Sequence, residues 1–170
     1  IIYIANPDNP MGTFITKSEF DKFYKSVPDR VLIILDEAYF EYAKDFEGYP
    51  NSMNYRYDNV ITLRTFSKAY GLAGIRVGYG FAHDSLIENL LKVKAPFEPS
   101  LLGQIAASAA LSDHFFLEKS IKMNNIGIKY LEGEFTKEDI RFISSSTNFI
   151  TTIWPSEKIA NQISHKLLKK

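Results

Sequence analysis

An uninterrupted apolar run, residues 31–35, leads directly into the acidic pair Asp36 and Glu37. A strand with one wet face alternates apolar and polar residues, whereas a parallel strand covered by helices on both faces is apolar throughout. The run therefore predicts a buried parallel strand with polar chemistry at its carboxyl end. A second apolar segment, residues 60–63, also ends in polar residues, beginning with Arg64.

Segments with helical spacing separate the predicted strands. Thr16 to Glu19 fits a capping box, and the helix that follows should end near Pro28. The remaining expected strands cover 1–4, 77–81, 140–143 and 149–154, and the remaining expected helices begin at Ser85 (a second capping box with Glu88), cover 101–131 with a break near 112–113, and begin at Ser156. This alternation predicts an α/β fold, in which ligands gather beyond the carboxyl ends of the strands.

Composition favours a small-molecule partner and excludes several kinds of site. The 20 basic and 20 acidic residues balance to a formal charge of zero, so neither nucleic acid nor a membrane surface is an expected partner. The absence of cysteine excludes disulfides and thiolate metal ligands, and no metal site is expected. No apolar run approaches the roughly 20 residues of a membrane helix, so the expected location is the cytoplasm.

The ends and the middle of the chain suggest how it is organised. It begins on the apolar residues 1–4 without an initiator methionine, so we interpret it as an internal fragment of a longer protein. The long helical segment after Pro99 could lead from one domain to another. We expect residues 1–112 to form part of a large domain with a mainly parallel sheet, and residues 113–170 to form part of a smaller α/β domain.

Three loops at the ends of successive predicted strands carry the polar side chains that could take part in catalysis or binding. These groups are Asn9, the pair Asp36 and Tyr39, and the cluster Thr65, Ser67, Lys68 and Arg76. Such loops could converge on one crevice. An amine, an acid, a phenol, an amide and a hydroxyl-rich loop with an arginine match the aldehyde, ring nitrogen, phenolic oxygen and phosphate of pyridoxal 5′-phosphate.

Three motifs carry a resemblance to a known family. They are Asn-Pro-Asp-Asn-Pro-Met-Gly at 6–12, Asp-Glu-Ala-Tyr at 36–39 and Thr-Phe-Ser-Lys-Ala-Tyr-Gly-Leu-Ala-Gly-Ile-Arg-Val-Gly at 65–78. In order and spacing they resemble the pyridoxal-phosphate-dependent aminotransferases of fold type I, most of all the histidinol-phosphate aminotransferases. The resemblance extends from residue 1 to about residue 112 and is weaker beyond. Met11 stands where the family usually has threonine.

The resemblance implies a role for each of the polar residues. Lys68 would attach covalently to the cofactor and then move a proton as a free amine, and Asp36 would keep the ring nitrogen protonated. With Tyr39, these two are the implied catalytic residues. The implied cofactor-binding residues are Asn9 and Tyr39 at the phenolic oxygen, Thr65, Ser67 and Arg76 at the phosphate, and Asp36 and Lys68 themselves.

The implied function is transfer of an amino group between an amino acid-like amine and a 2-oxo acid by a homodimer. Histidinol phosphate is the favoured amine and 2-oxoglutarate the favoured acceptor. The family's arginine for the substrate carboxylate and its N-terminal substrate loops fall outside this chain, so other amines stay open. Alternatives are an aromatic or aspartate aminotransferase, a threonine-phosphate decarboxylase, or a sensory module that binds the cofactor without turnover. A nucleotide-driven module is disfavoured, because the Gly-x-x-x-x-Gly-Lys-Ser/Thr loop is absent.

Overall fold

A four-stranded sheet forms the centre of the molecule. The computed structural model describes residues 1–55 and 58–169; residues 56–57 and 170 lie outside the described part. The strands are β1 (Ile2–Ala5), β2 (Ile33–Asp36), β3 (Val60–Thr65) and β4 (Gly78–Phe81), in the order β1-β2-β3-β4. Strands β1, β2 and β3 are parallel, and β4 is antiparallel to β3. The prediction of a mainly parallel sheet is confirmed.

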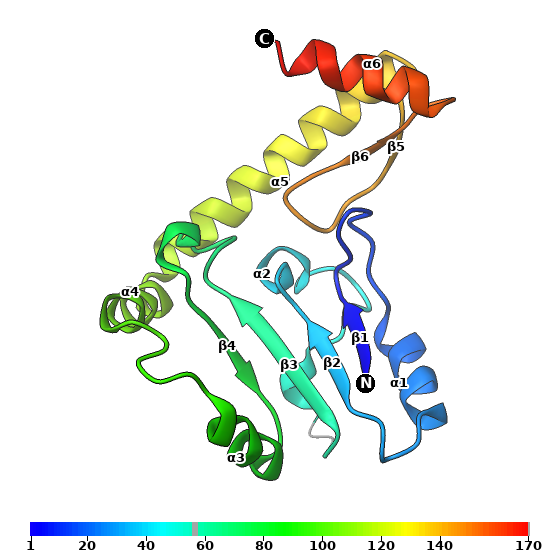
Figure 1. Cartoon of the computed structure of the whole chain (residues 1–170). Coiled ribbons are helices and arrows are strands. Elements are labelled where there is room, and N and C mark those ends of the chain that lie inside the picture. The colour runs from blue at the N-terminus through cyan, green and yellow to red at the C-terminus, as the bar shows by residue number, and fades with distance from the viewer. Residues whose placement is uncertain (56–57, 170) are drawn as a thin grey trace.

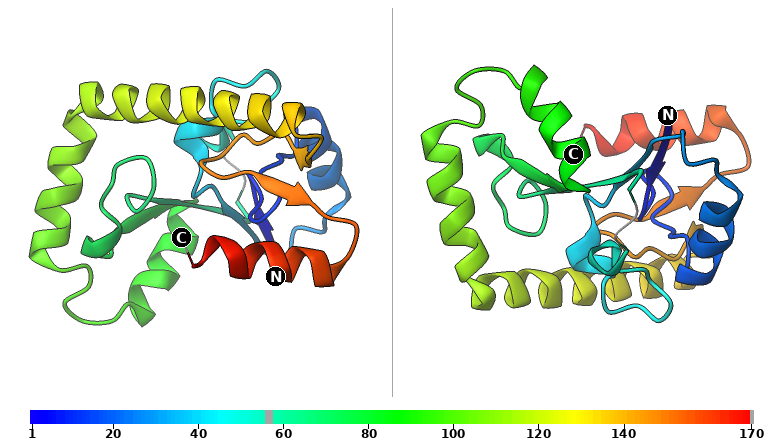
Figure 2. Two further views of the ribbon diagram at one scale, coloured as in Figure 1. Left: turned by 90° about the horizontal axis from the view of Figure 1, so that it is seen from above. Right: turned by 90° about the horizontal axis from the view of Figure 1, so that it is seen from below.

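Helices surround this sheet and one of them leads to a second, smaller sheet. The helices are α1 (Lys17–Ser26), α2 (Phe40–Ala43), α3 (Asp84–Val93), α4 (Leu101–Ser112), α5 (His114–Lys137) and α6 (Glu157–Leu167), with short 3-10 turns η1 (Ser52–Asn54) and η2 (Ala73–Ile75). Figure 1 shows α5 rising from the four-stranded sheet toward the antiparallel pair β5 (Arg141–Ile143) and β6 (Thr151–Ile153). Seen from above, α3 and α5 lie on opposite sides of the four-stranded sheet (Figure 2).

The strand predicted to be buried lies in the main core. Ile33 and Leu35 of β2 pack with Val60 of β3 and with Phe20 of α1, all almost inaccessible to solvent. Complete burial of such a side chain contributes about 1.5–3 kcal/mol. The hydrophobic run therefore decides both the place of β2 in the sheet and the face on which α1 packs.

Helix ends follow the local signals at most positions. The capping box before α1 is confirmed, because the backbone N–H of Glu19 donates to Thr16 Oγ1 and that of Thr16 donates to the Glu19 carboxylate. The predicted break near 112–113 is also confirmed, since the Asp113 side chain caps α5. Among the described helices, none is both long and apolar enough to cross a membrane.

One local prediction is wrong, and one short helix was not predicted. The second capping box is wrong: α3 begins at Asp84, so Ser85 lies inside its first turn and the His83 side chain accepts the cap hydrogen bond from the Ser85 backbone. The short helix α2 was not predicted at all. Its four residues are too few to display a helical period, and it forms where the chain turns after β2.

A buried ionic cluster lies beside α2. The Arg64 guanidinium donates to Glu37 Oε2 from Nε at 2.9 Å and from Nη2 at 2.8 Å, and it lies 3.3 Å from the centroid of the Phe40 ring. Both ionic side chains are at least 90% buried. Loss of one partner of such a pair costs about 3–5 kcal/mol, because a buried charge is left uncompensated.

Glu41 is the unpaired acid of this region. It is 3% exposed, and its Oε2 has no hydrogen-bond partner. Burial raises the pKa of Glu41 from 4.5 to about 7; the neighbouring Glu37 charge adds to this, while Arg64 and Lys44 oppose it. The folded protein therefore prefers the protonated acid at this position.

We expect the Glu41→Gln variant to lose part of the pH dependence of stability. The folded-state pKa of Glu41 lies above its ordinary value. The contribution of the protonated acid to the free energy of unfolding is therefore complete below pH 4.5 and is lost as pH rises through about 7. Above that pH the free energy of unfolding of the variant should exceed that of the wild type by about 3 kcal/mol. Urea titrations of the full-length gene product across this range measure the difference. The exposed Glu88→Gln is the control, and parallel pH curves for wild type and Glu41→Gln would contradict the assignment.

Candidate functional site

One cavity at the carboxyl ends of β2 and β3 collects most of the predicted site residues. Its volume is about 430 Å³. The predicted residues that line it are Asp36, Thr65, Ser67, Lys68 and Arg76, together with Ala38, Leu63, Arg64 and Ala73. Parallel strands bring their carboxyl ends to one edge of a sheet, which is why groups from separate loops meet here.

The turn after β3 presents two hydroxyl groups to the cavity. Phe66, between them, is buried against the rings of Tyr70 and Tyr79, so its side chain anchors the turn. The backbone N–H of Ser67 donates to Thr65 Oγ1 at 3.1 Å. Because that oxygen is used as an acceptor, the hydroxyl hydrogen of Thr65 stays able to donate to a ligand.

Arg76 closes the same cavity from the loop that follows Lys68. Its backbone is in the left-handed region with φ of 59°, an uncommon conformation for a residue other than glycine. Its Nη1 donates to the carbonyl of Ala73 at 2.6 Å. Residues held in such conformations gather at ligand sites, and a guanidinium is well suited to bind phosphate.

Asp36 is held by two hydrogen-bond donors, neither of which was predicted from the sequence. Its Oδ1 accepts from the backbone N–H of Ala38 at 3.1 Å, and its Oδ2 accepts from the hydroxyl of Tyr3. The hydrogen bond to Asp36 raises the pKa of Tyr3 to about 12, with burial and the Asp36 charge adding to the effect. Ala5 pairs with Asp36 in the β1–β2 register, so period-two counting back to Tyr3 could have placed both on one face.

Tyr39 and Asn9 reach the site beside Lys68. Asn9 Nδ2 donates to Tyr39 Oη at 3.0 Å, and Lys68 Nζ lies 5.2 Å from the centroid of the Tyr39 ring. Tyr39 is buried in a cluster with Tyr42 and Ala69, which holds its ring in place. All seven predicted residues therefore lie together. Five line the cavity, the ring of Tyr39 lies beside Lys68, and Asn9 is hydrogen-bonded to Tyr39.

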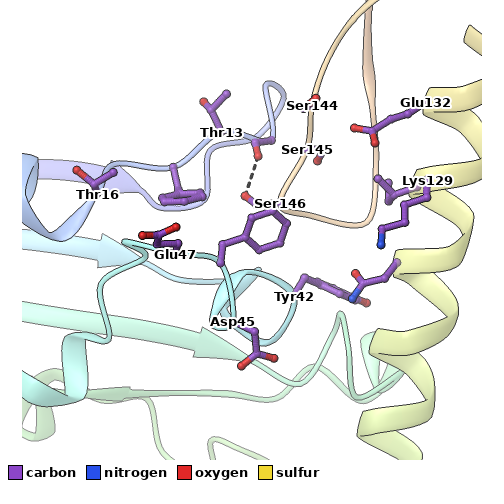
Figure 3. Close-up of a pocket in the computed structure, with 15 residues that line it drawn as sticks. Thr13, Thr16, Tyr42, Asp45, Glu47, Lys129, Glu132, Ser144, Ser145 and Ser146 are labelled. Atoms are coloured by element: carbon purple, nitrogen blue, oxygen red, sulfur yellow. Dashed lines mark hydrogen bonds between the residues drawn. The ribbon is translucent and has the colours of Figure 1, made fainter. Parts of the chain in front are cut away.

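A second cavity, of about 850 Å³, lies elsewhere and contains none of the seven. It is a groove between the β1–α1 loop (residues 6–16), the segment after α2, α5 and the β5–β6 loop (residues 144–150), as Figure 3 shows. Tyr42, Lys129 and Ser146 are among its lining residues. Its lining also includes three acids, Asp45, Glu47 and Glu132, but none of its described lining residues is an arginine, unlike those of the smaller cavity.

The chain matches, over residues 1–170, the family described as aminotransferase class I and II. The chain belongs to this family. Histidinol-phosphate aminotransferase 2 of Carboxydothermus hydrogenoformans is 42% identical over 172 residues, which cover 100% of this chain and 47% of the relative. Histidinol-phosphate aminotransferase of Bacillus subtilis is 40% identical, again over 100% of this chain and 47% of the relative.

Solved structures of the family share the fold. Histidinol-phosphate aminotransferase from Sinorhizobium meliloti, in complex with pyridoxal-5′-phosphate, has a TM-score of 0.86 and 31% identity over 94% of this chain and 44% of its own. A histidinol-phosphate aminotransferase from Clostridium acetobutylicum has a TM-score of 0.77 and 25% identity over 96% of this chain and 51% of its own. The expected fold class, that of fold-type-I aminotransferases, is confirmed. The chain spans about half the length of the curated relatives it matches.

Proposed function

We propose that the gene product containing this chain is a pyridoxal-phosphate-dependent aminotransferase that takes its amino group from histidinol phosphate and passes it to 2-oxoglutarate. The observation that carries the proposal is the meeting of Lys68, Asp36 and Arg76 on one cavity at the carboxyl edge of a parallel sheet. Family membership and the names of the relatives at 40–44% identity favour this chemistry and this amine.

The residues of the cavity fit pyridoxal phosphate. A volume of about 430 Å³ lies within the usual range for small-molecule sites, roughly 300–1,000 Å³. Arg76 and the hydroxyls of Thr65 and Ser67 form a donor set for a phosphate, and Asp36 offers an acceptor for a protonated ring nitrogen. Lys68 supplies the amine on the same surface. The fit rests on this combination, because each residue taken singly is common on protein surfaces.

Each residue then has a definite task. When bound, pyridoxal phosphate supplies an aldehyde that bonds to an amine and a ring that withdraws electrons from the reacting carbon. Lys68 Nζ holds the group covalently and, once free, moves the proton at the substrate carbon. The Asp36 carboxylate, oriented by Tyr3 and the Ala38 backbone, keeps the proton on the ring nitrogen. Its negative charge favours that protonated form.

Asn9 and Tyr39 are suited to bind the phenolic oxygen as a pair. Tyr39 accepts a hydrogen bond from Asn9, so its own hydroxyl hydrogen stays available to a ligand. The second amide hydrogen of Asn9 can donate to the same acceptor. Two donors on one oxygen stabilise its ionised form, and that in turn sets how strongly the neighbouring nitrogen of Lys68 retains a proton.

The organisation of the whole protein is part of the proposal. We place the boundary between a large and a small domain at residues 112–113, which is supported by the start of α5 there and by its course toward a separate sheet (Figure 1). We propose a homodimer in the cytoplasm with small-molecule substrates and with neither nucleic acid nor membrane as a partner. Exposed apolar side chains on α3 and α4, including Val93, Leu101 and Leu102, support a protein partner on that surface.

An amine-donor screen on the full-length gene product tests the proposed substrates. With pyridoxal phosphate and 2-oxoglutarate present, kcat/KM for histidinol phosphate should exceed that for phenylalanine, aspartate or threonine phosphate by at least about tenfold. Formation of glutamate is the measurement, with pyruvate and oxaloacetate as competing acceptors. Release of carbon dioxide from threonine phosphate would replace transamination with decarboxylation, and a bound cofactor without turnover would favour the sensory module.

A further inference from the structure

The β5–β6 loop is hydrogen-bonded directly to the β1–α1 loop beside the groove between the two sheets. The carbonyl of Gly12 accepts two hydrogen bonds from Ser146, one from its backbone N–H and one from its Oγ, each at 2.8 Å. Figure 3 shows this contact at the upper part of the groove. Thr151 Oγ1 also donates to the carbonyl of Pro10. Residues 134 positions apart in the chain are thereby joined.

Gly12 allows an approach that a side chain would prevent. A Cβ atom at this position would lie 2.3 Å from Ser145 Oγ and 2.9 Å from its Cβ, both far inside van der Waals contact. The backbone of Gly12 is also in the left-handed region, with φ of +75°. The two loops are therefore packed backbone to backbone, and any residue other than glycine must push them apart.

The β5–β6 loop is itself held firmly. Ser145 and Thr147 share a hydrogen bond of 2.7 Å between their hydroxyls, and the carbonyl of Thr147 accepts from Asn124 Nδ2 of α5 at 2.9 Å. The ring of Phe149 meets the ring of Tyr39 edge to face, with centroids 5.3 Å apart. One loop thus contacts both segments that carry the donor pair, the Asn9 loop through Gly12 and Tyr39 through Phe149.

We propose that Ser146 and Gly12 are positioning residues, which set the place of Asn9 relative to Tyr39 from across the groove. The proposal rests on the proposed function, because it assigns the two residues an effect on the phenolic oxygen that Asn9 and Tyr39 would bind. The β1–α1 loop keeps its own shape through hydrogen bonds such as Gly12 N–H to the Asp8 carbonyl at 2.9 Å. The contact with Ser146 joins the Gly12 end of that loop to the β5–β6 loop, which also packs on Tyr39 through Phe149.

Misplacement of Asn9 has a measurable electrostatic consequence. Donors on the phenolic oxygen stabilise its negative charge, and that charge otherwise attracts a proton to the nearby nitrogen of Lys68. Weaker hydrogen bonds from Asn9 and Tyr39 leave the phenolic oxygen more basic, so the nitrogen of Lys68 keeps its proton to higher pH. The visible absorption of the bound cofactor reports this protonation, and its pH midpoint should move upward.

The experiment uses the full-length gene product with bound pyridoxal phosphate and titrates its visible absorption with pH. The variants are Ser146→Ala, which removes one of the two donors to Gly12, and Gly12→Ala, which forces the loops apart. Matched controls are Ser144→Ala, exposed on the same loop, and Gly127→Ala on α5, where an added Cβ would meet nothing within 4 Å. Thermal unfolding of each cofactor-free variant is recorded beside the titration.

We expect the midpoint to rise by about half a pH unit in Ser146→Ala and by about one unit in Gly12→Ala, with both controls at the wild-type value. If Gly12→Ala does not fold, Ser146→Ala decides the matter. A lowered melting temperature with an unchanged midpoint would overturn the proposal, because it would leave these residues a purely structural role. A wild-type protein without any absorption from Lys68-bound cofactor would instead overturn the proposed function, and the positioning role with it.

Discussion

Lys68→Arg in the full-length gene product should abolish covalent cofactor attachment and lower transamination by about 10⁴-fold or more. A guanidinium keeps the positive charge but is neither a nucleophile nor a base at neutral pH, so both tasks of the lysine are lost while the charge of the cavity is retained. General acid–base catalysis alone contributes about 10²- to 10⁴-fold. The loss of the covalent bond adds to that effect. Steady-state rates and the visible absorption of the cofactor measure the two losses separately.

Borohydride reduction followed by peptide mapping gives the direct test of the attachment point. In the wild type the label should lie on Lys68, and in Lys68→Arg it should disappear. Lys25→Arg is a suitable control, because Lys25 is exposed in the last turn of α1, away from the cavity. A label that stays at full strength in Lys68→Arg would move the attachment point to another lysine and remove Lys68 from the proposed function.

Features set by neighbouring residues were predictable from the sequence. The apolar run before Asp36 gave the buried β2, and the Thr16–Glu19 capping box gave the start of α1. Such signals depend on period, burial on both faces and hydrogen bonds within one turn. The convergence of the three polar loops also followed, since parallel strands share one carboxyl edge.

Features set by contacts between distant segments were not predictable. Tyr3 reaches Asp36 from a neighbouring strand, and period-two counting places the two side chains on one face only once the β1–β2 register is known. The join between Gly12 and Ser146 depends on the path of α5, which brings the β5–β6 hairpin back over the sheet. In α3 the N-cap is His83 and not Ser85, because the helix begins two residues earlier than the capping-box pattern indicated. Local patterns define elements, whereas packing decides which of their side chains meet.

The arrangement at Asp36 leads to the second large expected effect. Asp36→Asn should retain the cofactor but lower the transamination rate by about 10²- to 10³-fold, the usual range when one preorganised electrostatic partner is removed from an active site. An amide cannot supply the negative charge that holds a proton on the ring nitrogen. Its shape is close to that of the acid, so the backbone N–H of Ala38 can still find an acceptor.

Tyr3→Phe separates the charge of Asp36 from its orientation. That variant keeps the carboxylate and loses one donor to it, so its rate should fall by about tenfold, near the lower end of the range for one hydrogen bond to a charged group. Asp29→Asn, in an exposed turn before β2, is the control for loss of a surface charge. Single-turnover kinetics with saturating cofactor isolates proton removal from cofactor binding. A near-normal single-turnover rate in Asp36→Asn would mean that the ring nitrogen needs no charged partner, and a larger loss in Tyr3→Phe than in Asp36→Asn would make the tyrosine, rather than the acid, the essential group.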